Sequence, residues 1–480
     1  MRPARLCVTV TGQTMAELRE RRDRVADADL VELRVDTVRD PSAAGALAGR
    51  RVPVIFTCRA PWEGGHFKGS EEERHRLLHD AQRLGAEYVD VEWKAGFGDL
   101  LSAKGGKGIV LSMHDFEGVP NDLDARAATM KASGAEVVKI AVNAARLSDC
   151  LPLLAVGRAS TTPMVLVGMG DAGLPTRVLS ARFGSCWSYA GDGVAPGQIS
   201  QCLLRDQYSF RSLSDRTAVY GVVGRPVMHS LSPAMHNAAF KAAEIDAVYL
   251  PLAAADFDDF LRFADAIGMH GASITAPFKL DAFEASAECD PVSRRIQSVN
   301  TVRHDGNRWV GCNTDVAGFL KPLKRAMAIK DRRATILGAG GAARAASEAL
   351  SAAGARVTIS ARTPQHAQQT AALTGASTTR WPPPDDSWDL LVNTTPVGTS
   401  PAIDATPLPS GSFRGELVYD LVYNPLKTRL LRDAEAAGCR TLSGLEMLVA
   451  QAELQFEWWT GIRPLERSMR DAALTALERL

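Results

Sequence analysis

Eight short apolar runs recur between residues 6 and 190, and a stretch of helical spacing follows most of them. The runs are Leu6–Val10, Leu30–Asp36, Pro53–Arg59, Tyr88–Trp93, Gly108–Phe116, Val137–Val142, Met164–Met169 and Cys186–Ala190. Strands that alternate with helices favour βαβ units and a parallel sheet. Eight such units in this length are typical of a compact (β/α)8 barrel, although a doubly wound sheet gives a similar pattern.

A second organisation begins after the polar junction Arg211–Thr217. Ala218–Val223 has the character of a new strand, and a mixed α/β segment follows it. Further on, the strand-like run Arg333–Gly338 leads through a glycine turn into an alanine-rich helix and then into the strand Arg356–Arg362. Gly444–Leu480 is predicted to form two helices separated by Gly461–Pro464.

Length and charge narrow the class of protein. At about 150 residues per domain, 480 residues predict about three domains, or two if one is a barrel. A hydrophobic content of 46% excludes general disorder. The 55 basic and 55 acidic side chains cancel, whereas a nucleic-acid partner usually requires a basic excess.

The cysteines and the N-terminus bear on location. None of the 8 cysteines forms a CxxC pair, so we expect no structural zinc and instead buried, reduced thiols. The first ten residues pass directly into an apolar strand without a signal peptide, and no apolar stretch is long enough to span a bilayer. We therefore expect a cytoplasmic protein with no membrane partner.

One lysine stands inside the apolar run Val137–Val142. With the two-residue alternation of a strand, Lys139 shares a face with Val137 and Ala141. Burial there disfavours the charged ammonium, and a neutral amine is a nucleophile that forms a Schiff base with a carbonyl. The alternative is a strand-end lysine whose amine reaches solvent.

Other polar residues stand at the ends of further predicted strands. Three charges alternate along Leu30–Asp36, Arg59 ends the next strand with Glu63 four residues on, and His114 lies near the end of a later one. Singly, each has a structural explanation, such as an ion pair. Together with Lys139 they lie near the carboxyl ends of four strands, where barrel enzymes form their active sites.

Six motifs, ELRVD, FTCR with a following Glu, SMHDF, VKIAV, FGS and APGQ, occur in the order found in type I 3-dehydroquinate dehydratases. Residues 5–210 resemble this family, which implies a (β/α)8 barrel that dehydrates 3-dehydroquinate through an imine. The resemblance implies that Lys139 is the Schiff-base lysine, His114 the general acid/base and Glu63 the acid that orients the histidine. It implies substrate contacts by Glu32, Arg34, Arg59, Arg177 and Gln198. Val194 departs from the family, in which a hydroxyl residue often stands there.

The segment Gly338-Ala339-Gly340-Gly341-Ala342-Ala343 matches G-x-G-x-x-G/A between a strand and a helix, the context of a dinucleotide-binding turn. An NAD site usually has an acidic residue about 20 positions on, at the end of the next strand. Here that strand ends in Arg362, whose guanidinium would suit a 2′-phosphate, so NADP is favoured. The alternative for Arg362 is a solvated charge.

Nine motifs, SLSPAMHNAAF, TAPFK, SVNTV, NTDVAGF, GAGGAARA, SART, NTTPVG, YNP and GLEMLVAQ, occur in the order found in shikimate dehydrogenases. The likeness spans residues 218–478 and implies Lys279 and Asp315 as the catalytic pair. It implies substrate contacts by Ser230, Ser232, Thr275, Asn300, Tyr423 and Gln451. The implied cofactor contacts are Gly338, Ala339, Gly340, Gly341, Ala342, Arg362, Thr363, Asn393, Thr394, Gly444 and Met447. Ala361 and His366 depart from the family, which often has Asn and Arg there.

The expected protein is a bifunctional enzyme. A barrel at 1–212 would convert 3-dehydroquinate to 3-dehydroshikimate. A substrate domain at 217–322, completed by helices at about 445–480, and a Rossmann-like NADP domain at 323–444 would reduce it to shikimate. Two alternatives are a catabolic NAD-dependent quinate/shikimate dehydrogenase fused to a dehydratase, and a catalytically retired metabolite-sensing regulator. Only small-molecule partners are expected, with no metal and no nucleic acid.

Overall fold

Eight parallel strands form the first sheet, in the order β7-β6-β5-β4-β3-β2-β1-β8. The computed structural model describes residues 4–191, 193, 197–409 and 413–479. The strands are β1 Arg5–Val10, β2 Leu30–Arg34, β3 Val54–Thr57, β4 Tyr88–Glu92, β5 Ile109–Asp115, β6 Val137–Asn143, β7 Met164–Met169 and β8 Trp187–Ala190. Each lies within or overlaps one of the eight predicted runs, and their ends differ by only a few residues.

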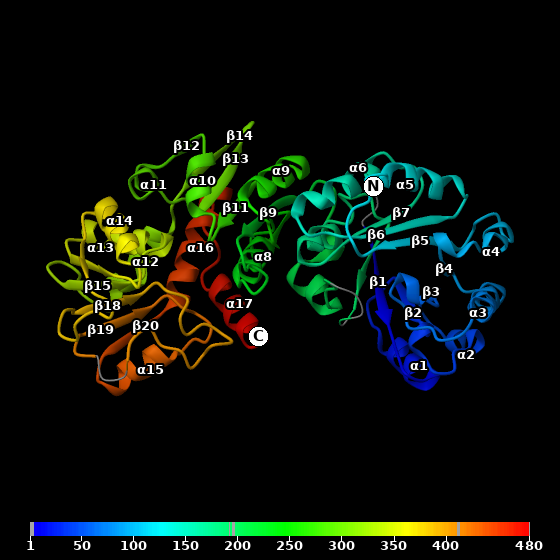
Figure 1. The fold of residues 1–480 in the computed structure, drawn as a ribbon, viewed down its shortest axis with the longest axis horizontal. Helices are drawn as coiled ribbons and strands as arrows, with labels where there is room; N and C mark the ends of the chain where they lie inside the picture. Colours follow the sequence, from blue (N-terminus) through cyan, green and yellow to red (C-terminus); the bar gives the residue numbers. More distant parts are fainter. Residues whose placement is uncertain (1–3, 192, 194–196, 410–412, 480) are drawn as a thin grey trace. The chain divides into compact units, whose positions relative to one another are not determined.

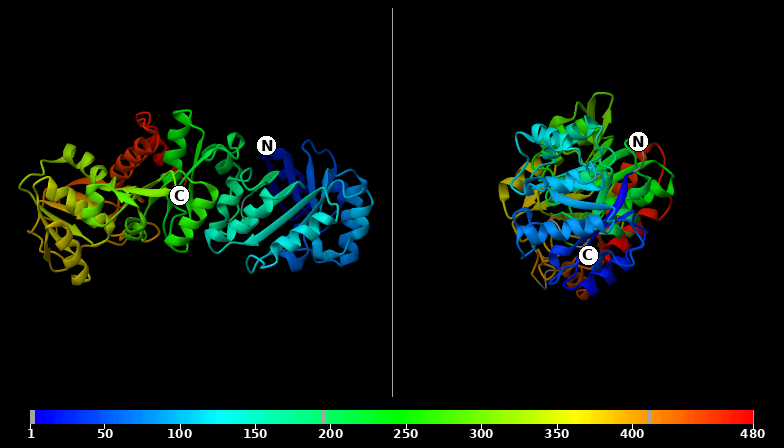
Figure 2. Two further views of the ribbon diagram at one scale, coloured as in Figure 1. Left: turned by 90° about the horizontal axis from the view of Figure 1, so that it is seen from above. Right: turned by 90° about the vertical axis from the view of Figure 1, so that its right-hand side faces the viewer.

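A bridge between Met164 and Ser185 joins the two ends of this sheet. The backbone N–H of Leu166 also donates to Ser185 Oγ at 2.9 Å, so the sheet is a nearly closed barrel. Helices lie around the barrel strands (Figures 1 and 2). They are α1 Met15–Arg24, α2 Ala43–Leu47, α3 Glu71–Arg83, α4 Gly98–Ser102, α5 Leu123–Ala132, α6 Leu151–Arg158 and α7 Leu174–Val178, with short turns η1 Val35–Thr37, η2 Pro61–Glu63, η3 Trp93–Ala95, η4 Leu147–Cys150, η5 Asp171–Gly173, η6 Leu203–Gln207 and η7 Phe210–Ser212.

The barrel interior is filled by inward side chains from most of the strands. One buried cluster consists of Cys7, Leu30, Ile55, Val110, Val137, Ala141, Val165, Val167, Met169, Trp187 and Tyr189. Val137 and Ala141 belong to it, so the face of β6 that carries Lys139 points into the barrel. The alternation predicted that these three residues share a face, but not which way that face points. The barrel is therefore a packed core, and the space for a ligand lies toward the carboxyl ends of its strands.

The second sheet is mixed, with the order β10-β9-β11-β13-β14-β12. Its strands are β9 Ala218–Val223, β10 Ala247–Leu252, β11 Gly271–Ile274, β12 Glu288–Cys289, β13 Thr301–Asp305 and β14 Arg308–Cys312. The helices associated with it are α8 Ser232–Ala242, α9 Phe257–Ile267, α10 Lys279–Ala285, α11 Pro291–Ile296, α16 Gly444–Thr460 and α17 Ser468–Leu477. The two predicted C-terminal helices are thus present, and α8 packs against both.

The third sheet is parallel throughout, in the doubly wound order β17-β16-β15-β18-β19-β20. Its strands are β15 Arg333–Leu337, β16 Arg356–Ser360, β17 Ser377–Thr379, β18 Leu390–Asn393, β19 Leu417–Asp420 and β20 Arg440–Ser443. Its helices are α12 Asp315–Ala326, α13 Gly341–Ala352, α14 Pro364–Thr374 and α15 Arg429–Ala436. Buried residues of α12 and α13 pack on Ile336 and Val392, whereas those of α15 pack on Leu337, Leu391 and Val418. Both faces of the sheet are covered, and the strand order reverses beside β15, where such folds bind ligands.

The predicted fold class, an α/β chain with an N-terminal barrel and a Rossmann-like part, is confirmed. Most contacts between residues fall within two compact units of the chain. The first consists of Met1–Ala218 with Asp246–Gly268, and the second of Val219–Ile245 with Met269–Leu480. Among the described residues, none of the helices combines the length and the apolar character that crossing a bilayer requires. The eight cysteines are free, but only four of them are buried. Cys202, which directly precedes η6, is exposed.

Candidate active sites

The carboxyl ends of the barrel strands enclose a cavity of about 110 Å³. All eight residues predicted for the barrel site line it, namely Glu32, Arg34, Arg59, Glu63, His114, Lys139, Arg177 and Gln198. They come from β2, β5, β6, α7 and the segments after β3 and β8. The barrel topology therefore brings together side chains that lie far apart in the sequence. Val194 lies outside the described residues.

Lys139 is 6% exposed, so its amine is not in open solvent. Nζ lies 3.4 Å from Glu32 Oε1 and 3.4 Å from Asp90 Oδ2. It also stands 4.4 Å from the centroid of the Tyr189 ring, within range of a cation–π contact. The buried amine therefore has two carboxylates and a ring face around it.

His114, the predicted general acid/base, and Glu63, the acid predicted to orient it, are in direct contact. His114 Nδ1 lies 2.9 Å from Glu63 Oε2, which leaves Nε2 for a substrate. Burial raises the pKa of Glu63 to about 8, against the effect of Arg59, and burial together with Arg59 and Lys139 lowers the pKa of His114 well below its usual value. Both groups are thus disfavoured in their charged forms, and the hydrogen bond between them fixes the orientation of the ring.

A buried network of charged and polar side chains supports this site. Four of its members, Asp90, Glu92, Arg74 and Ser112, were not predicted from the sequence. Arg59 donates to Glu92 Oε1 at 3.0 Å and to Ser112 Oγ at 2.8 Å, and pairs with Asp90 Oδ2 at 2.9 Å. Arg74, which is fully buried, reaches the other oxygen of Glu92 at 2.5 Å. Burial alone would raise the pKa of Asp90, but Arg59 and Lys139 outweigh it and hold that pKa well below its usual range.

The signal for Asp90 and Glu92 is present in the sequence Tyr88-Val89-Asp90-Val91-Glu92. Two acids alternate there with valines on one strand. The charged residues Glu32 and Arg34 alternate with apolar residues on β2 in the same way. A charged face on a barrel strand is costly unless its charges are paired, so this alternation predicts basic partners. The identity of those partners depends on strands adjacent in the barrel.

Arg34 and Arg177 have different surroundings within the cavity wall. Arg34 donates to both carboxylate oxygens of Asp36 at 2.8 Å. The prediction that Asp36 continues β2 is wrong, because the strand ends at Arg34 and η1 turns Asp36 back onto it. Arg177 on α7 is 3% exposed, and burial lowers its pKa to about 10. A guanidinium held in this environment suits a substrate carboxylate.

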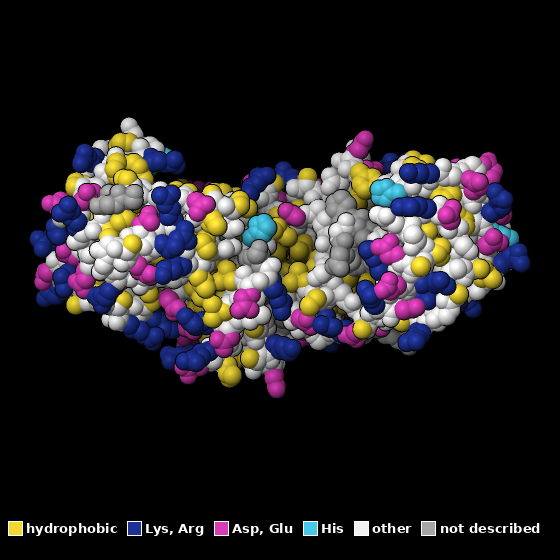
Figure 3. Space-filling model, turned by 90° about the horizontal axis from the view of Figure 1, so that it is seen from below, with side chains coloured by type: hydrophobic (Ala, Val, Ile, Leu, Met, Phe, Trp, Pro, Cys, Tyr) yellow, Lys and Arg dark blue, Asp and Glu magenta, His cyan; other side chains and the backbone are white. Residues whose placement is uncertain are grey.

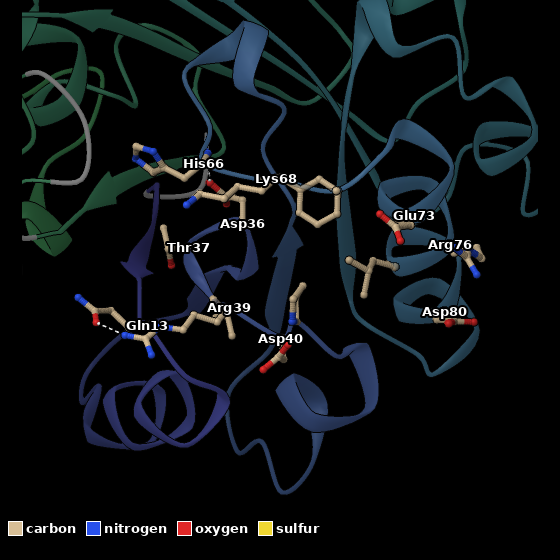
Figure 4. Close-up of a pocket in the computed structure, with 15 residues that line it drawn as sticks. Gln13, Asp36, Thr37, Arg39, Asp40, His66, Lys68, Glu73, Arg76 and Asp80 are labelled. Carbon is tan, nitrogen blue, oxygen red and sulfur yellow. Dashed lines mark hydrogen bonds between the residues drawn. The ribbon is translucent and has the colours of Figure 1, made fainter.

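A wider, open cavity of about 980 Å³ lies beside this site. Figure 4 shows its labelled side chains, among them Asp36, His66, Lys68 and Glu73, around a groove with charges of both signs. None of the eight predicted barrel-site residues lines it. The chemistry predicted from the sequence therefore belongs to the smaller cavity, and the Arg34–Asp36 pair connects the linings of the two.

In the second unit, the predicted catalytic pair is in direct contact. Lys279 Nζ donates to Asp315 Oδ2 at 2.5 Å, and the two side chains are 17% and 7% exposed. Asn300 Nδ2 donates to the other oxygen of Asp315 at 2.8 Å and to Gln451 Oε1 at 3.4 Å. Four predicted residues thus form one hydrogen-bonded group. Thr314, which donates its backbone N–H to Asn300 Oδ1 at 2.8 Å, was not predicted.

The other predicted substrate contacts lie at loops and element ends. Ser230 Oγ accepts from the backbone of Ser232 at 3.2 Å, at the start of α8. Thr275 follows β11, and a Cβ on Gly224 would lie 2.2 Å from its Cγ2, so a glycine is needed for this approach. Tyr423 follows β19, and burial raises its pKa. Their roles toward a substrate stay predictions.

The glycine turn connects β15 with α13 and lies next to Lys279. Gly338 has a φ of +110°, and a Cβ there would lie 2.5 Å from Thr394 Oγ1. A Cβ on Gly341 would lie 2.9 Å from Lys279 Cδ, so the first turn of α13 is close to Lys279. Gly340, at the helix start, has open space around it. This cradle fits a pyrophosphate at a helix N-terminus.

The remaining predicted cofactor residues divide into an exposed and a buried group. Arg362 and Thr363 follow β16 and are exposed, as is His366 on α14, whereas Ala361 is half-buried. Asn393 is buried, donates to Asp420 at 2.9 Å and accepts from Thr395, so its amide supports the loop after β18. Met447 belongs to the core beside α12, and Gly444 allows α16 to start against the Leu421 carbonyl. Cofactor contacts by these residues stay predictions.

No group of three or more His, Cys, Asp or Glu that could hold a metal ion occurs within the part of the chain that the structure describes. The two candidate sites contain amines, carboxylates, guanidinium groups, a histidine and amides. In each, a lysine sheltered from solvent lies against at least one carboxylate.

Three family models match successive parts of the chain. Residues 6–215 match the model of type I 3-dehydroquinase. Residues 222–302 match the shikimate dehydrogenase substrate binding domain, and residues 444–474 match the shikimate 5'-dehydrogenase C-terminal domain. The order is the one that the sequence motifs predicted.

Known proteins resemble the chain as a whole and in its second half. The bifunctional 3-dehydroquinate dehydratase/shikimate dehydrogenase, chloroplastic, of Arabidopsis thaliana is 32% identical over 96% of this chain and 82% of its own. A shikimate dehydrogenase (NADP(+)) of Moorella thermoacetica is 41% identical over 53% of this chain and 94% of its own. The crystal structure of shikimate 5-dehydrogenase from Thermus thermophilus in complex with NADP(H) and shikimate covers 54% of this chain and 99% of its own, with 37% identity and a TM-score of 0.50.

These matches confirm the predicted resemblance over both halves. One relative spans nearly the whole chain, and the matches to separate models fall on the barrel and on the second unit. The chain therefore belongs to the family of bifunctional 3-dehydroquinate dehydratase/shikimate dehydrogenases.

Proposed function

We propose that the barrel dehydrates 3-dehydroquinate to 3-dehydroshikimate, and that the second unit reduces this product to shikimate with NADPH. The observation that carries the proposal is the surroundings of two lysines. Lys139 lies in one cavity with the His114–Glu63 pair, and Lys279 is hydrogen-bonded to Asp315 beside a glycine turn. The two reactions are consecutive, so one chain would carry an intermediate from its formation to its use.

In the barrel, the amine of Lys139 adds to the substrate ketone and water leaves, which forms an iminium. The iminium acidifies the neighbouring C–H, and His114 Nε2 removes that proton. The enamine expels the β-hydroxyl, which takes the proton back from His114 and leaves as water. Hydrolysis of the imine then frees Lys139, so the net change is the loss of one water. Glu63 orients the ring, and Arg177 is placed to bind the carboxylate.

In the second unit, NADPH supplies a hydride when it is bound. The resulting alkoxide needs a proton, and Lys279 is the group placed to donate it, with Asp315 stabilising the ammonium. Asn300 and Gln451 extend this polar group and would hold substrate hydroxyls. Gly338, Gly340 and Gly341 would accommodate the pyrophosphate, and Arg362 would bind the 2′-phosphate, which supports NADP over NAD.

We also propose the domain division stated above, with the barrel at 1–212, the substrate domain at 217–322 and 445–480, and the NADP domain at 323–444. The family-model matches support these boundaries. A cytoplasmic location is supported by the eight free cysteines, since thiols stay reduced there. Small molecules as the only partners, without nucleic acid, are supported by the zero net charge and by the mixture of basic and acidic side chains on the face in Figure 3.

A coupled assay tests the proposal directly. Purified full-length chain with 3-dehydroquinate and NADPH should oxidise the cofactor, which is followed by its absorbance. Faster turnover of quinate with NAD than of shikimate with NADP would favour the catabolic alternative. Turnover of neither substrate would favour a retired regulator.

Borohydride tests the imine separately. Reduction in the presence of 3-dehydroquinate should attach the ligand covalently to Lys139, as located by peptide mass analysis. Attachment at another lysine, or the absence of any attachment, would contradict the Schiff-base mechanism at Lys139 but would leave the reductase proposal intact.

A further inference from the structure

We propose that Gln455 is a positioning residue of the reductase site, acting through Thr301 and Asn300 on the Lys279–Asp315 pair. The inference rests on the proposed reduction and adds to it a buried residue that is not among the predicted substrate or cofactor contacts. Gln455 lies one helical turn beyond Gln451 on α16, and it is 1% exposed.

The amide of Gln455 can take only one orientation. Nε2 donates to the carbonyl oxygen of Asn300 at 3.2 Å and to Thr301 Oγ1 at 2.9 Å, and Oε1 accepts from Ser273 Oγ at 2.8 Å. A carbonyl oxygen is only an acceptor, so the amide nitrogen must face it. Reversing the amide would place two oxygens together in a buried site, which is costly.

This orientation sets the direction of the next hydrogen bonds. Because Thr301 Oγ1 accepts from Gln455, its own proton points to Asn300 Oδ1, at 2.9 Å. The backbone N–H of Thr314 also donates to Asn300 Oδ1, at 2.8 Å. The Thr314 hydroxyl lies within reach of the same oxygen, at 3.3 Å. Because these donors face Asn300 Oδ1, its Nδ2 faces Asp315 Oδ1, at 2.8 Å.

This series of hydrogen bonds ends at the Lys279–Asp315 pair, which is the proposed proton donor. Asn300 holds one oxygen of Asp315, which leaves the other for Lys279 at 2.5 Å. Without Gln455, the Thr301 hydroxyl could turn to Thr314 Oγ1, 3.4 Å away, and Asn300 Oδ1 would lose one of the donors that orient it. A small displacement of such a group is expected to slow the chemical step much more than it weakens cofactor binding.

Three single variants and one double variant of the full chain test this. Gln455→Leu should lower kcat for 3-dehydroshikimate reduction by about tenfold to a hundredfold and shift the pH profile of kcat, with KM for NADPH changed less than about twofold. Thr301→Val should behave in the same way, and Thr301→Ser, which keeps the hydroxyl, should retain activity. The double variant Gln455→Leu/Thr301→Val should be no slower than the slower single variant, since both break one path. Dehydratase turnover of the same chain measures the amount of protein, and the nearly unchanged KM for NADPH shows that the second unit is folded.

Reduction by Gln455→Leu within about twofold of wild type, or a double variant whose loss equals the product of the single losses, would overturn the inference. If Gln455→Leu does not fold, the Thr301 pair decides, because equal activity of the Val and Ser variants would also overturn it. A wild-type chain that fails to reduce 3-dehydroshikimate would overturn the proposed function and this inference with it. An active wild type with unaffected variants would overturn this inference alone.

Discussion

At the scale of single residues, the Glu63–His114 pair shows how burial sets the chemistry of the barrel. Both groups lose solvent, so the acid is held protonated to a higher pH and the imidazole is held neutral to a lower one. Arg59, 3.7 Å from Glu63, opposes the first effect and contributes to the second. The residue types could be predicted from the sequence, but the balance between burial and a buried arginine could not.

Glu63→Gln should make the protein's stability less sensitive to alkaline pH. The pKa of Glu63 is raised to about 8 in the folded chain, above its usual value. Its contribution to stability is therefore fully present below the unfolded pKa and is lost as pH rises through about 8. The melting temperature of the wild type should fall relative to that of the variant between pH 5 and pH 9. If the melting temperatures of the two proteins changed in parallel over that pH range, the carboxyl of Glu63 would not be held protonated in the folded chain.

Arg362→Ala should raise KM for NADPH far more than KM for NADH. Arg362 follows β16 at its carboxyl end and is exposed, so its loss should not disturb packing. A hydrogen bond to a charged group contributes about 1.5–3 kcal/mol, so a rise of roughly tenfold to a hundredfold is expected. The matched control is Arg356→Ala, at the exposed opposite end of the same strand, which should leave both constants unchanged. Equal changes in KM for NADPH and NADH would show that Arg362 does not bind the 2′-phosphate.

At the scale of elements, the strands were predictable and their side-chain partners were not. Period-2 alternation predicted that Lys139 shares a face with Val137 and Ala141, but both faces of β6 are apolar and buried, so only the structure shows that this face points into the barrel. Its contact with Asp90 depends on β4, two strands away in the barrel order, and on the register between them. Asn300 and Gln451 likewise meet through α16, 151 residues apart. Motif order identified Asn300 and Gln451 but not Asp90, and the spacing of residues predicted none of these contacts.

Arg74→Met should destabilise the barrel, although α3 lies outside the ring of strands. Arg74 is fully buried and pairs with Glu92, so its removal leaves a buried carboxylate short of one partner. Breaking a buried pair in this way costs about 3–5 kcal/mol. Dehydratase activity should be lost at a lower urea concentration than in wild type. Arg83→Met on the same helix, 72% exposed and 3.9 Å from Asp80, is the control and should not shift the midpoint. An unchanged midpoint for Arg74→Met would show that Arg59 alone satisfies Glu92.

At the scale of the whole molecule, the two reactions use separate sets of residues. The barrel site draws on residues 32–198, and the reductase pair and its amides draw on residues 279–451. Each set is completed within its own compact unit. The fusion places both sites in one chain, which raises the concentration of the intermediate near the second site, but neither site needs a side chain of the other.

Two single-site variants should therefore complement each other in a mixture. His114→Ala should lose dehydration and keep reduction, and Lys279→Ala should lose reduction and keep dehydration. Neither alone should oxidise NADPH when given 3-dehydroquinate, but an equimolar mixture should, because 3-dehydroshikimate released by one chain can diffuse to the other. Cofactor absorbance measures this, and wild type at the same concentration of each intact site is the control. A mixture as inactive as its components would mean that the intermediate must pass within one chain, and that the two sites are not independent.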